Sequence, residues 1–194
     1  MEFSNRIKGT VSEALLQAIL EDAGYRIIAL GVEEILREVK PLRVQQYVEL
    51  NLPEVVCRLP DFFVADRDLT QWWLMEVKYR RRWEQARIDL ESELVSQLRH
   101  FSPLHVLICV AESGQTNESN PPAWFRIATL ELDASNRVAI RYPSGSLGLL
   151  READWHTLHR VQDIFVQVGD RWPEQTLRKA KMVMQSLREL QILN

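Results

Sequence analysis

Two short stretches of the sequence place charged side chains among apolar ones. Asp61 lies in an apolar run over residues 59–66, and Glu76 and Lys78 lie in a second apolar run over residues 74–79. Both runs predict β-strands, in which residues two apart share one face at a spacing of about 6.6 Å. Glu76 and Lys78 therefore point the same way. If the two strands pair as a hairpin, Asp61 comes to lie beside Glu76.

Two carboxylates and an ammonium are costly to desolvate on an apolar sheet unless they are paired or bind a metal ion. Mg²⁺ takes carboxylate oxygens and keeps several waters. A metal lowers the pKa of a bound water, and a neighbouring lysine can orient that water or help to deprotonate it. The predicted chemistry is attack of a metal-activated water on a phosphodiester bond, with Mg²⁺ or Mn²⁺ as cofactor. The alternative is an ordinary hairpin with an exposed Glu76–Lys78 pair, which contributes little to stability.

The order Pro60-Asp61, fourteen further residues, then Glu76-Val77-Lys78 resembles the motif of the PD-(D/E)XK nuclease superfamily. By this resemblance, Asp61 and Glu76 are metal ligands and the Val77 carbonyl is a further ligand. Lys78 is then the catalytic base or the residue that positions the attacking water.

The start of the chain predicts a helix over residues 9–23 and then a strand over residues 25–30. Thr10 and Glu13 have the spacing of a capping box, and Gly24 suits the end of the helix. A helix and strand in this order also resemble the start of many PD-(D/E)XK nucleases, archaeal-type Holliday-junction resolvases among them. In those proteins a helical glutamate joins the metal site, which here would be Glu13. The other interpretation is that Glu13 only closes the capping box.

A basic stretch follows the motif. Arg80, Arg81 and Arg82 precede a helix predicted over residues 84–101, which also carries Arg87. Arginines at a helix N-terminus run against the preference of the helix dipole for acidic residues. This favours a patch that contacts DNA phosphates, although a solvated basic turn fits the same residues.

The same helix carries Gln97 four residues before Phe101. This spacing resembles the Gln-x-x-x-Tyr element of RecB-like nucleases, with phenylalanine at the tyrosine position. Gln97 could contact DNA or a metal-bound water, and the alternative is an ordinary surface glutamine. Residues 105–111 predict a buried central strand. The succession of helix, strand, hairpin, helix and strand matches the αβββαβ core that the resemblance implies, over residues 8–111.

Two more strands are predicted over residues 124–132 and 137–142, and Pro173 suits the first turn of a long last helix. The predicted architecture is a single α/β domain over residues 1–194, with a restriction-endonuclease-like core and a mixed central sheet flanked by helices. Residues 112–194 form a C-terminal extension of that domain. The apolar stripe of the last helix packs on the domain or on a second copy in a homodimer.

Composition narrows the class of protein. The chain has 194 residues, of which 46% are hydrophobic, and a net charge of −3, so any DNA-binding face must be local. Cys57 and Cys109 are expected to be buried thiols in a reducing compartment. No apolar run reaches membrane-spanning length, no signal peptide begins the chain, and no GxxxxGK loop is present. These features predict a cytoplasmic protein with no membrane contact and no ATP motor of its own.

The sequence therefore predicts a metal-dependent deoxyribonuclease. The alternative is a catalytically silent nuclease-fold module for DNA binding or assembly, although the intact Asp61, Glu76 and Lys78 argue against loss of activity. A sugar hydrolase with a carboxylate pair would explain Asp61 and Glu76 but leaves Lys78 without a role. The DNA structure that is cut, and endonuclease versus exonuclease action, are left open.

Overall fold

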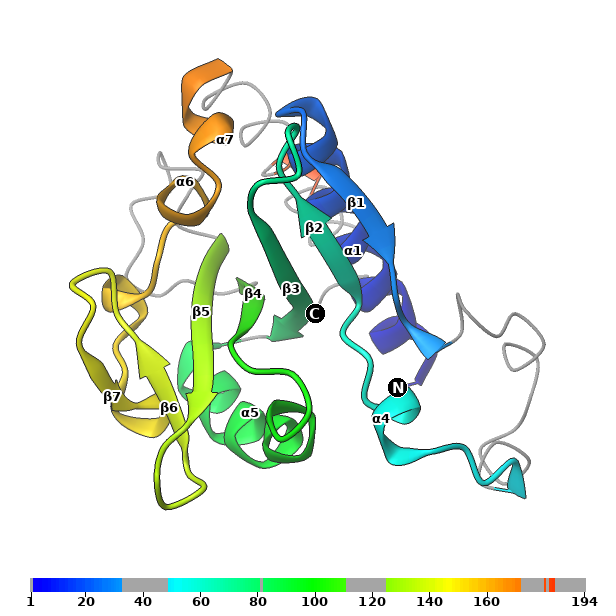
Figure 1. Cartoon of the computed structure of the whole chain (residues 1–194), viewed down its shortest axis with the longest axis vertical. Helices are drawn as coiled ribbons and strands as arrows, with labels where there is room; N and C mark the ends of the chain where they lie inside the picture. The colour runs from blue at the N-terminus through cyan, green and yellow to red at the C-terminus, as the bar shows by residue number, and fades with distance from the viewer. Residues whose placement is uncertain are drawn as a thin grey trace.

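The structure is a computed structural model that describes residues 2–32, 49–80, 82–110, 125–171, 180 and 182–183. Within these ranges the chain forms a mixed sheet of seven strands together with several helices (Figure 1). In chain order the elements are α1 (Glu2–Asp22), β1 (Arg26–Ala29), α4 (Glu54–Cys57), β2 (Phe62–Ala65), β3 (Trp72–Arg80), α5 (Trp83–Leu98), β4 (Leu104–Val110), β5 (Phe125–Leu132), β6 (Val138–Arg141), β7 (Leu147–Leu149), η3 (Leu150–Glu152), η4 (Trp155–Thr157), α6 (Val161–Ile164) and α7 (Val166–Arg171). The predicted α/β class is confirmed.

The strands lie in the sheet in the same order as in the chain. Every neighbouring pair is antiparallel except β3 and β4, which are parallel. A parallel pair needs a crossover connection, and α5 provides it. The described elements include the predicted helix, strand, hairpin, helix and strand in that order, with the short helix α4 between the first strand and the hairpin. The predicted long C-terminal helix lies outside the described residues, apart from helical residues 180, 182 and 183.

The sheet has an apolar layer on each face. On β4, Leu107 and Cys109 belong to the cluster that includes α1, whereas Val106 and Ile108 belong to the cluster that includes α5. β4 is thus buried on both faces, as its unbroken apolar run predicts. α1 and α5 therefore cover opposite faces, and they fix which face each side chain of the neighbouring β3 can reach.

The first helix begins earlier than the sequence predicts. α1 starts at Glu2, so Thr10 lies inside the helix and does not cap it. The capping-box prediction is wrong because residues 2–9 contain no proline or other strong helix breaker, and a single Gly9 costs only about 1 kcal/mol in a helix. The predicted end at Gly24 is confirmed by its positive φ of 88°.

One cysteine prediction is also wrong. Cys109 is buried on β4, where burial raises the pKa of its thiol to about 12. Cys57 is exposed, because it ends the short helix α4, which has no buried residues. No helix among the described residues is long and apolar enough to cross a membrane.

Candidate active site on strand β3

The hairpin of β2 and β3 brings the acidic residues of the motif together. Phe62 lies opposite Met75, and continuing this antiparallel register by one residue places Asp61 opposite Glu76. Met75 and Val77 pack in the cluster that includes α1. Because side chains alternate along a strand, Glu76 must face the other way, toward α5.

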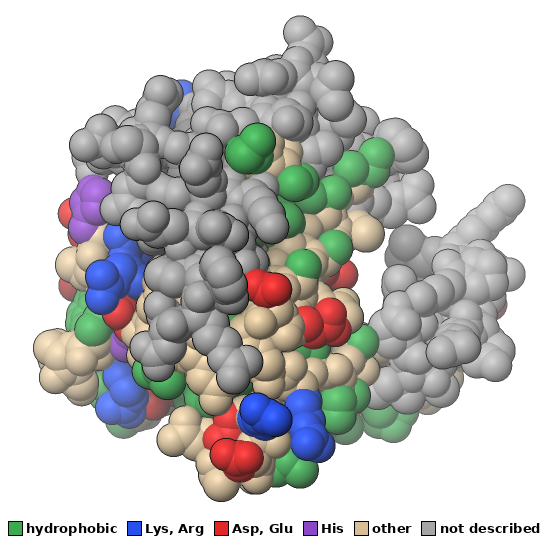
Figure 2. All heavy atoms as spheres, turned by 90° about the horizontal axis from the view of Figure 1, so that it is seen from above, with side chains coloured by type: hydrophobic (Ala, Val, Ile, Leu, Met, Phe, Trp, Pro, Cys, Tyr) green, Lys and Arg blue, Asp and Glu red, His purple; other side chains and the backbone are tan. Residues whose placement is uncertain are grey.

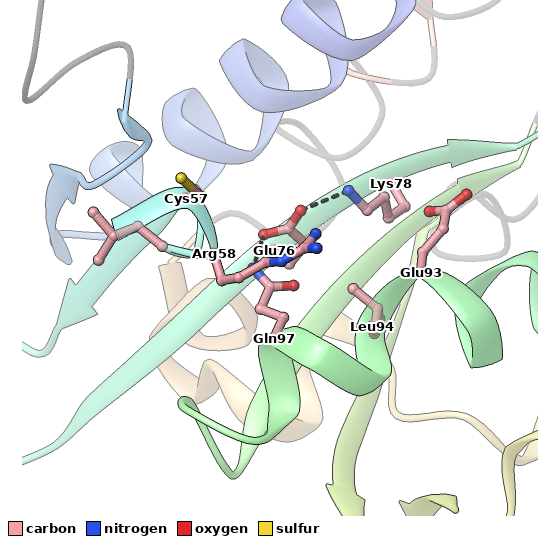
Figure 3. A pocket seen from close by; sticks show the side chains of 8 residues that line it. Cys57, Arg58, Glu76, Lys78, Glu93, Leu94 and Gln97 are labelled. Atoms are coloured by element: carbon pink, nitrogen blue, oxygen red, sulfur yellow. Dashed lines mark hydrogen bonds and ion pairs between the residues drawn. The ribbon is translucent and has the colours of Figure 1, made fainter. Parts of the chain in front are cut away.

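Glu76 is held from two sides. Its side chain is buried, with the residue only 6% exposed. The Lys78 Nζ lies 2.6 Å from its Oε1, and the Gln97 Nε2 donates to its Oε2 at 2.9 Å (Figure 3). Gln97 is itself buried, so the interpretation of Gln97 as an ordinary surface residue is wrong.

Asp61 carries negative charge in a poorly solvated place. Burial, and then the charges of Glu76 and Glu13, raise its pKa from the ordinary 3.8 to about 7. A hydrogen bond from the Val77 N–H to Asp61 Oδ2, at 2.7 Å, and the charge of Lys78 act in the opposite direction. Asp61 therefore exchanges its proton near neutral pH.

Glu13 lies close enough to Asp61 for its charge to affect the pKa of that carboxyl. Glu13 lies in the middle of α1 and is half-buried. Since Thr10 lies inside the helix, Glu13 closes no capping box there. Glu13 is thus within electrostatic range of Asp61, on the helix that covers the opposite face of the sheet from Glu76.

Lys78 remains an ammonium in this arrangement. Burial lowers its pKa, but the charge of Glu76, its hydrogen bond to Glu76 and the charge of Asp61 outweigh burial, so the pKa lies above its usual value. A lysine in this state can bind a negatively charged group and stabilise its charge. It is a poor general base at neutral pH.

The Val77 carbonyl has no ladder donor on the side of β2. Val77 points its N–H toward Asp61, and in an antiparallel pair the N–H and C=O of one residue face the same neighbour. Continuing the register by one more residue places Pro60 opposite Val77, and proline has no N–H to donate. The carbonyl oxygen is therefore available to a water or a cation.

A cleft of about 320 Å³ opens over Glu76 and Lys78. It lies between the end of α4 and the face of α5, and its lining consists of Cys57, Arg58, Leu59, Glu76, Lys78, Glu93, Leu94 and Gln97. Arg58 points toward Glu76 in Figure 3. Sequence reasoning missed Arg58, because nothing in the local pattern indicates that the residue after a short helix reaches this cleft.

Two of the arginines expected to bind DNA are directed at protein groups. Arg80 donates to Glu93 at 2.6 Å and lies 3.5 Å from Asp89. Arg87 donates to the Ala153 carbonyl at 3.4 Å. The other two of the predicted patch are Arg82, which is exposed at the start of α5, and Arg81, which lies outside the described residues.

The oxygen ligands that this site offers are of the kind that a hard cation such as Mg²⁺ takes, and Mg²⁺ needs few of them from the protein. No group of three His, Cys, Asp or Glu side chains that could hold a metal ion is found in the described part of the chain. Mg²⁺, however, is commonly bound by one or two carboxylates and completes its shell with water and substrate oxygens. Asp61, Glu76 and the Val77 carbonyl are the groups that could hold such an ion, and the raised pKa of Asp61 reflects burial beside the negative charge of Glu76.

No family of known proteins matches this chain, and comparison with curated proteins and with solved structures also finds no match. The fold and the site define a class only: an α/β protein with a mixed sheet, in which a glutamate and a lysine pair on one central strand and an aspartate lies directly before the neighbouring strand.

Proposed function

We propose that this protein is a metal-dependent nuclease of PD-(D/E)XK type that hydrolyses phosphodiester bonds in DNA. The observation that carries the proposal is that Glu76 and Lys78 line one cleft as an ion pair, and that the charges of both act on the neighbouring Asp61. Asp61 has a pKa of about 7, because burial and the charge of Glu76 disfavour its ionised form, and a bound cation would stabilise that form. Lys78 is the adjacent positive charge.

The fold supports the same proposal. The order α1, β1, β2, β3, α5, β4, with β3 and β4 parallel, agrees with the αβββαβ core that the resemblance implies for residues 8–111. β5 continues the same sheet by pairing with β4. This continuity favours residues 112–194 as an extension of one domain.

Each residue has a role that follows from its contacts. Mg²⁺ or Mn²⁺, held by Asp61, Glu76 and the Val77 carbonyl with Glu13 at the rim, would supply Lewis-acid stabilisation and a water of lowered pKa. Lys78, as an ammonium, neutralises Glu76 and can stabilise the negative charge that builds up on the attacked phosphate.

Two hydrogen bonds fix the orientation of the two carboxylates. The Gln97 amide fixes one oxygen of Glu76, which limits the rotation of that carboxylate. The Val77 N–H holds one oxygen of Asp61 in the same way. Because the pKa of Asp61 is about 7, the carboxylate form becomes dominant above that pH. Cation binding and cleavage should therefore strengthen as the pH rises from 6 to 8.

The test is a cleavage assay with Mg²⁺ or Mn²⁺ on linear duplex, circular, single-stranded and branched DNA. We expect cleavage that depends on the divalent ion in the parent and is lost in Asp61→Asn. Asp66→Asn is the matched control, because Asp66 lies on the same hairpin but accepts hydrogen bonds from Thr70 and does not line the cleft. Full activity in Asp61→Asn would refute the assigned site. A parent that binds DNA and cuts none of the four substrates would instead be the catalytically silent module.

A second readout does not depend on activity. Titration with Mn²⁺, followed by calorimetry, should show binding to the parent and to Asp66→Asn. Binding to Asp61→Asn should be at least tenfold weaker, because one of two carboxylate ligands is lost. Equal affinity in the parent and Asp61→Asn would mean that any ion binds elsewhere.

A further inference from the structure

The face of the sheet that carries Glu76 continues along β3 to the exposed Trp72, which stacks on the half-buried Phe63 of β2. Trp73 packs in the cluster that includes α1, so Trp72 and Leu74 lie on the same face as Glu76 and Lys78. Trp72 lies four positions before Glu76 on the strand, which is about 13 Å along one face.

Trp72 presents an unusually exposed ring. Its exposed fraction is 62%, and it stacks on Phe63 of β2 with ring centroids 5.9 Å apart and an interplanar angle of 16°. Large aromatic side chains bury most of their surface in ordinary folds. Figure 1 shows α1 behind β1 and β2, with no described helix in front of them. The Trp72 ring is thus accessible on the side of the sheet that leads to the cleft.

A cation lies at each end of this face. Arg26 of β1 pairs with Ala65 of β2, which in turn pairs with Trp72. Arg26 and Trp72 are therefore in one row across the sheet, about 10 Å apart, with only the small alanine between them. At the other end, Arg58 lines the cleft.

Both arginines are exposed. Neither guanidinium has a hydrogen-bond or ion-pair partner in the described part of the chain, in contrast to Arg80. The aromatic strip, meaning Arg26, Phe63, Trp72 and Leu74, thus offers an aromatic surface beside an unpaired positive charge.

We propose that the aromatic strip binds a single strand of nucleic acid and leads it into the cleft over Glu76. A base stacks on Trp72, and phosphates contact Arg26 and, past the active site, Arg58. This inference rests on the proposed function, because it identifies the substrate class of that same cleft. It predicts that the nuclease acts on single-stranded segments, overhangs or frayed ends.

The chemistry of the strip favours a single strand over a duplex. Stacking on a protein ring needs an unpaired base face, which single strands offer and duplex interiors do not. Duplex binding by charge alone needs an extended basic surface. The net charge is −3, and Figure 2 shows basic side chains interspersed with acidic ones on the described surface. Two isolated arginines beside an aromatic pair suit a strand that is bound by stacking and a few phosphates.

The test is equilibrium binding in EDTA, so that cleavage cannot occur. Fluorescence anisotropy is measured with labelled oligo-dT, with labelled oligo-rU and with a blunt duplex. We expect Trp72→Ala to weaken binding of the single strands by roughly tenfold to a hundredfold, the range that loss of one stacked base gives. Duplex binding should change less than twofold. The dT and rU measurements distinguish DNA from RNA as the preferred strand.

Two variants guard against a trivial result. Trp72→Phe keeps an aromatic ring and should retain most of the affinity for single strands. Ile88→Ala removes an equally exposed apolar side chain, 61% exposed on α5, and should leave binding unchanged. Thermal melting of each variant checks that the fold is intact. Arg26→Gln should make the salt dependence of single-strand binding shallower, by about 0.7 in the log–log slope.

The outcomes are distinguishable from those of the nuclease test. Unchanged single-strand binding in a folded Trp72→Ala overturns the inference, whether or not the parent cuts DNA. Self-association of the parent that is lost in Trp72→Ala, with single-strand binding unchanged, also overturns it and assigns the strip to a second copy. Loss of single-strand binding in Trp72→Ala with no cleavage by the parent supports the strip and rejects the nuclease.

Discussion

Replacing Asp61 with asparagine should stabilise the protein at high pH, although it removes a proposed metal ligand. The asparagine carbonyl oxygen can accept the hydrogen bond that the Val77 N–H now donates to Asp61 Oδ2 at 2.7 Å. The substitution therefore removes mainly the negative charge, which burial and Glu76 make unfavourable.

The size of the effect follows from the pKa. In the unfolded chain the carboxyl loses its proton near pH 3.8, whereas in the folded protein it does so at about 7. The folded state of the parent thus loses stability as the pH rises between these two values, and the loss is complete above pH 7. Between pH 5 and pH 8 about two pKa units of this window are crossed. At about 1.4 kcal/mol per unit, Asp61→Asn gains roughly 3 kcal/mol over the parent across that interval.

The assay is urea unfolding of both proteins at pH 5 and pH 8 without divalent ions. The free energy of unfolding of Asp61→Asn, relative to the parent, should be about 3 kcal/mol more favourable at pH 8 than at pH 5. Asp66→Asn is the control, because the pKa of Asp66 is shifted in the opposite direction from that of Asp61. The pKa of Asp66 is lowered, first of all by a hydrogen bond from Thr70, so its stabilising effect is present at both pH values and its loss should be the same at both. A difference for Asp61→Asn that does not change with pH would refute the electrostatic argument.

Three further substitutions test the remaining contacts. Lys78→Met should lower cleavage by about 100-fold or more, because it removes a charge that stabilises the attacked phosphate. It should keep the rise in Tm that Mn²⁺ produces, since an ammonium is no metal ligand; loss of the Tm shift would give Lys78 a purely structural role. Gln97→Ala removes the buried donor to one oxygen of Glu76 and should lower the free energy of unfolding by about 1–3 kcal/mol, as measured by urea unfolding. An unchanged value would mean that a water replaces the amide. Arg58→Gln should weaken binding of single-stranded DNA and reduce its salt slope by about 0.7. Arg80→Gln should leave the slope unchanged, because Arg80 is bound to acidic side chains of α5; the reverse order in titrations at several salt concentrations would contradict the structure.

The hairpin geometry could be predicted from the sequence because it is local. The alternation of Met75 and Val77 with Glu76 and Lys78 sets the two faces of β3, and the short connection to β2 sets the pairing. The buried strand β4 is visible for the same reason, since its apolar run needs burial on both faces.

The contacts that complete the site depend on the crossover from β3 to β4 and could not be predicted. Arg80 follows the motif and looks free in the sequence, yet the return of α5 over the sheet places Glu93 against it. The same packing brings Gln97 to Glu76 from 21 positions further along the chain. Arg58 reaches the cleft from the other side. Each of these distances depends on the position of a whole helix, which local patterns do not fix.

The lengths of the strands have a consequence for aggregation. In the described sheet the edge strands β1 and β7 have four and three residues, whereas the inner strands β3 and β5 have nine and eight. A short edge exposes few unpaired backbone N–H and C=O groups to another chain. Edge-to-edge growth into fibrils is therefore disfavoured, although the sheet contains long runs of β-branched and aromatic residues. The long apolar strand β4 lies in the middle of the described sheet, so its backbone is paired on both sides and cannot pair with another chain.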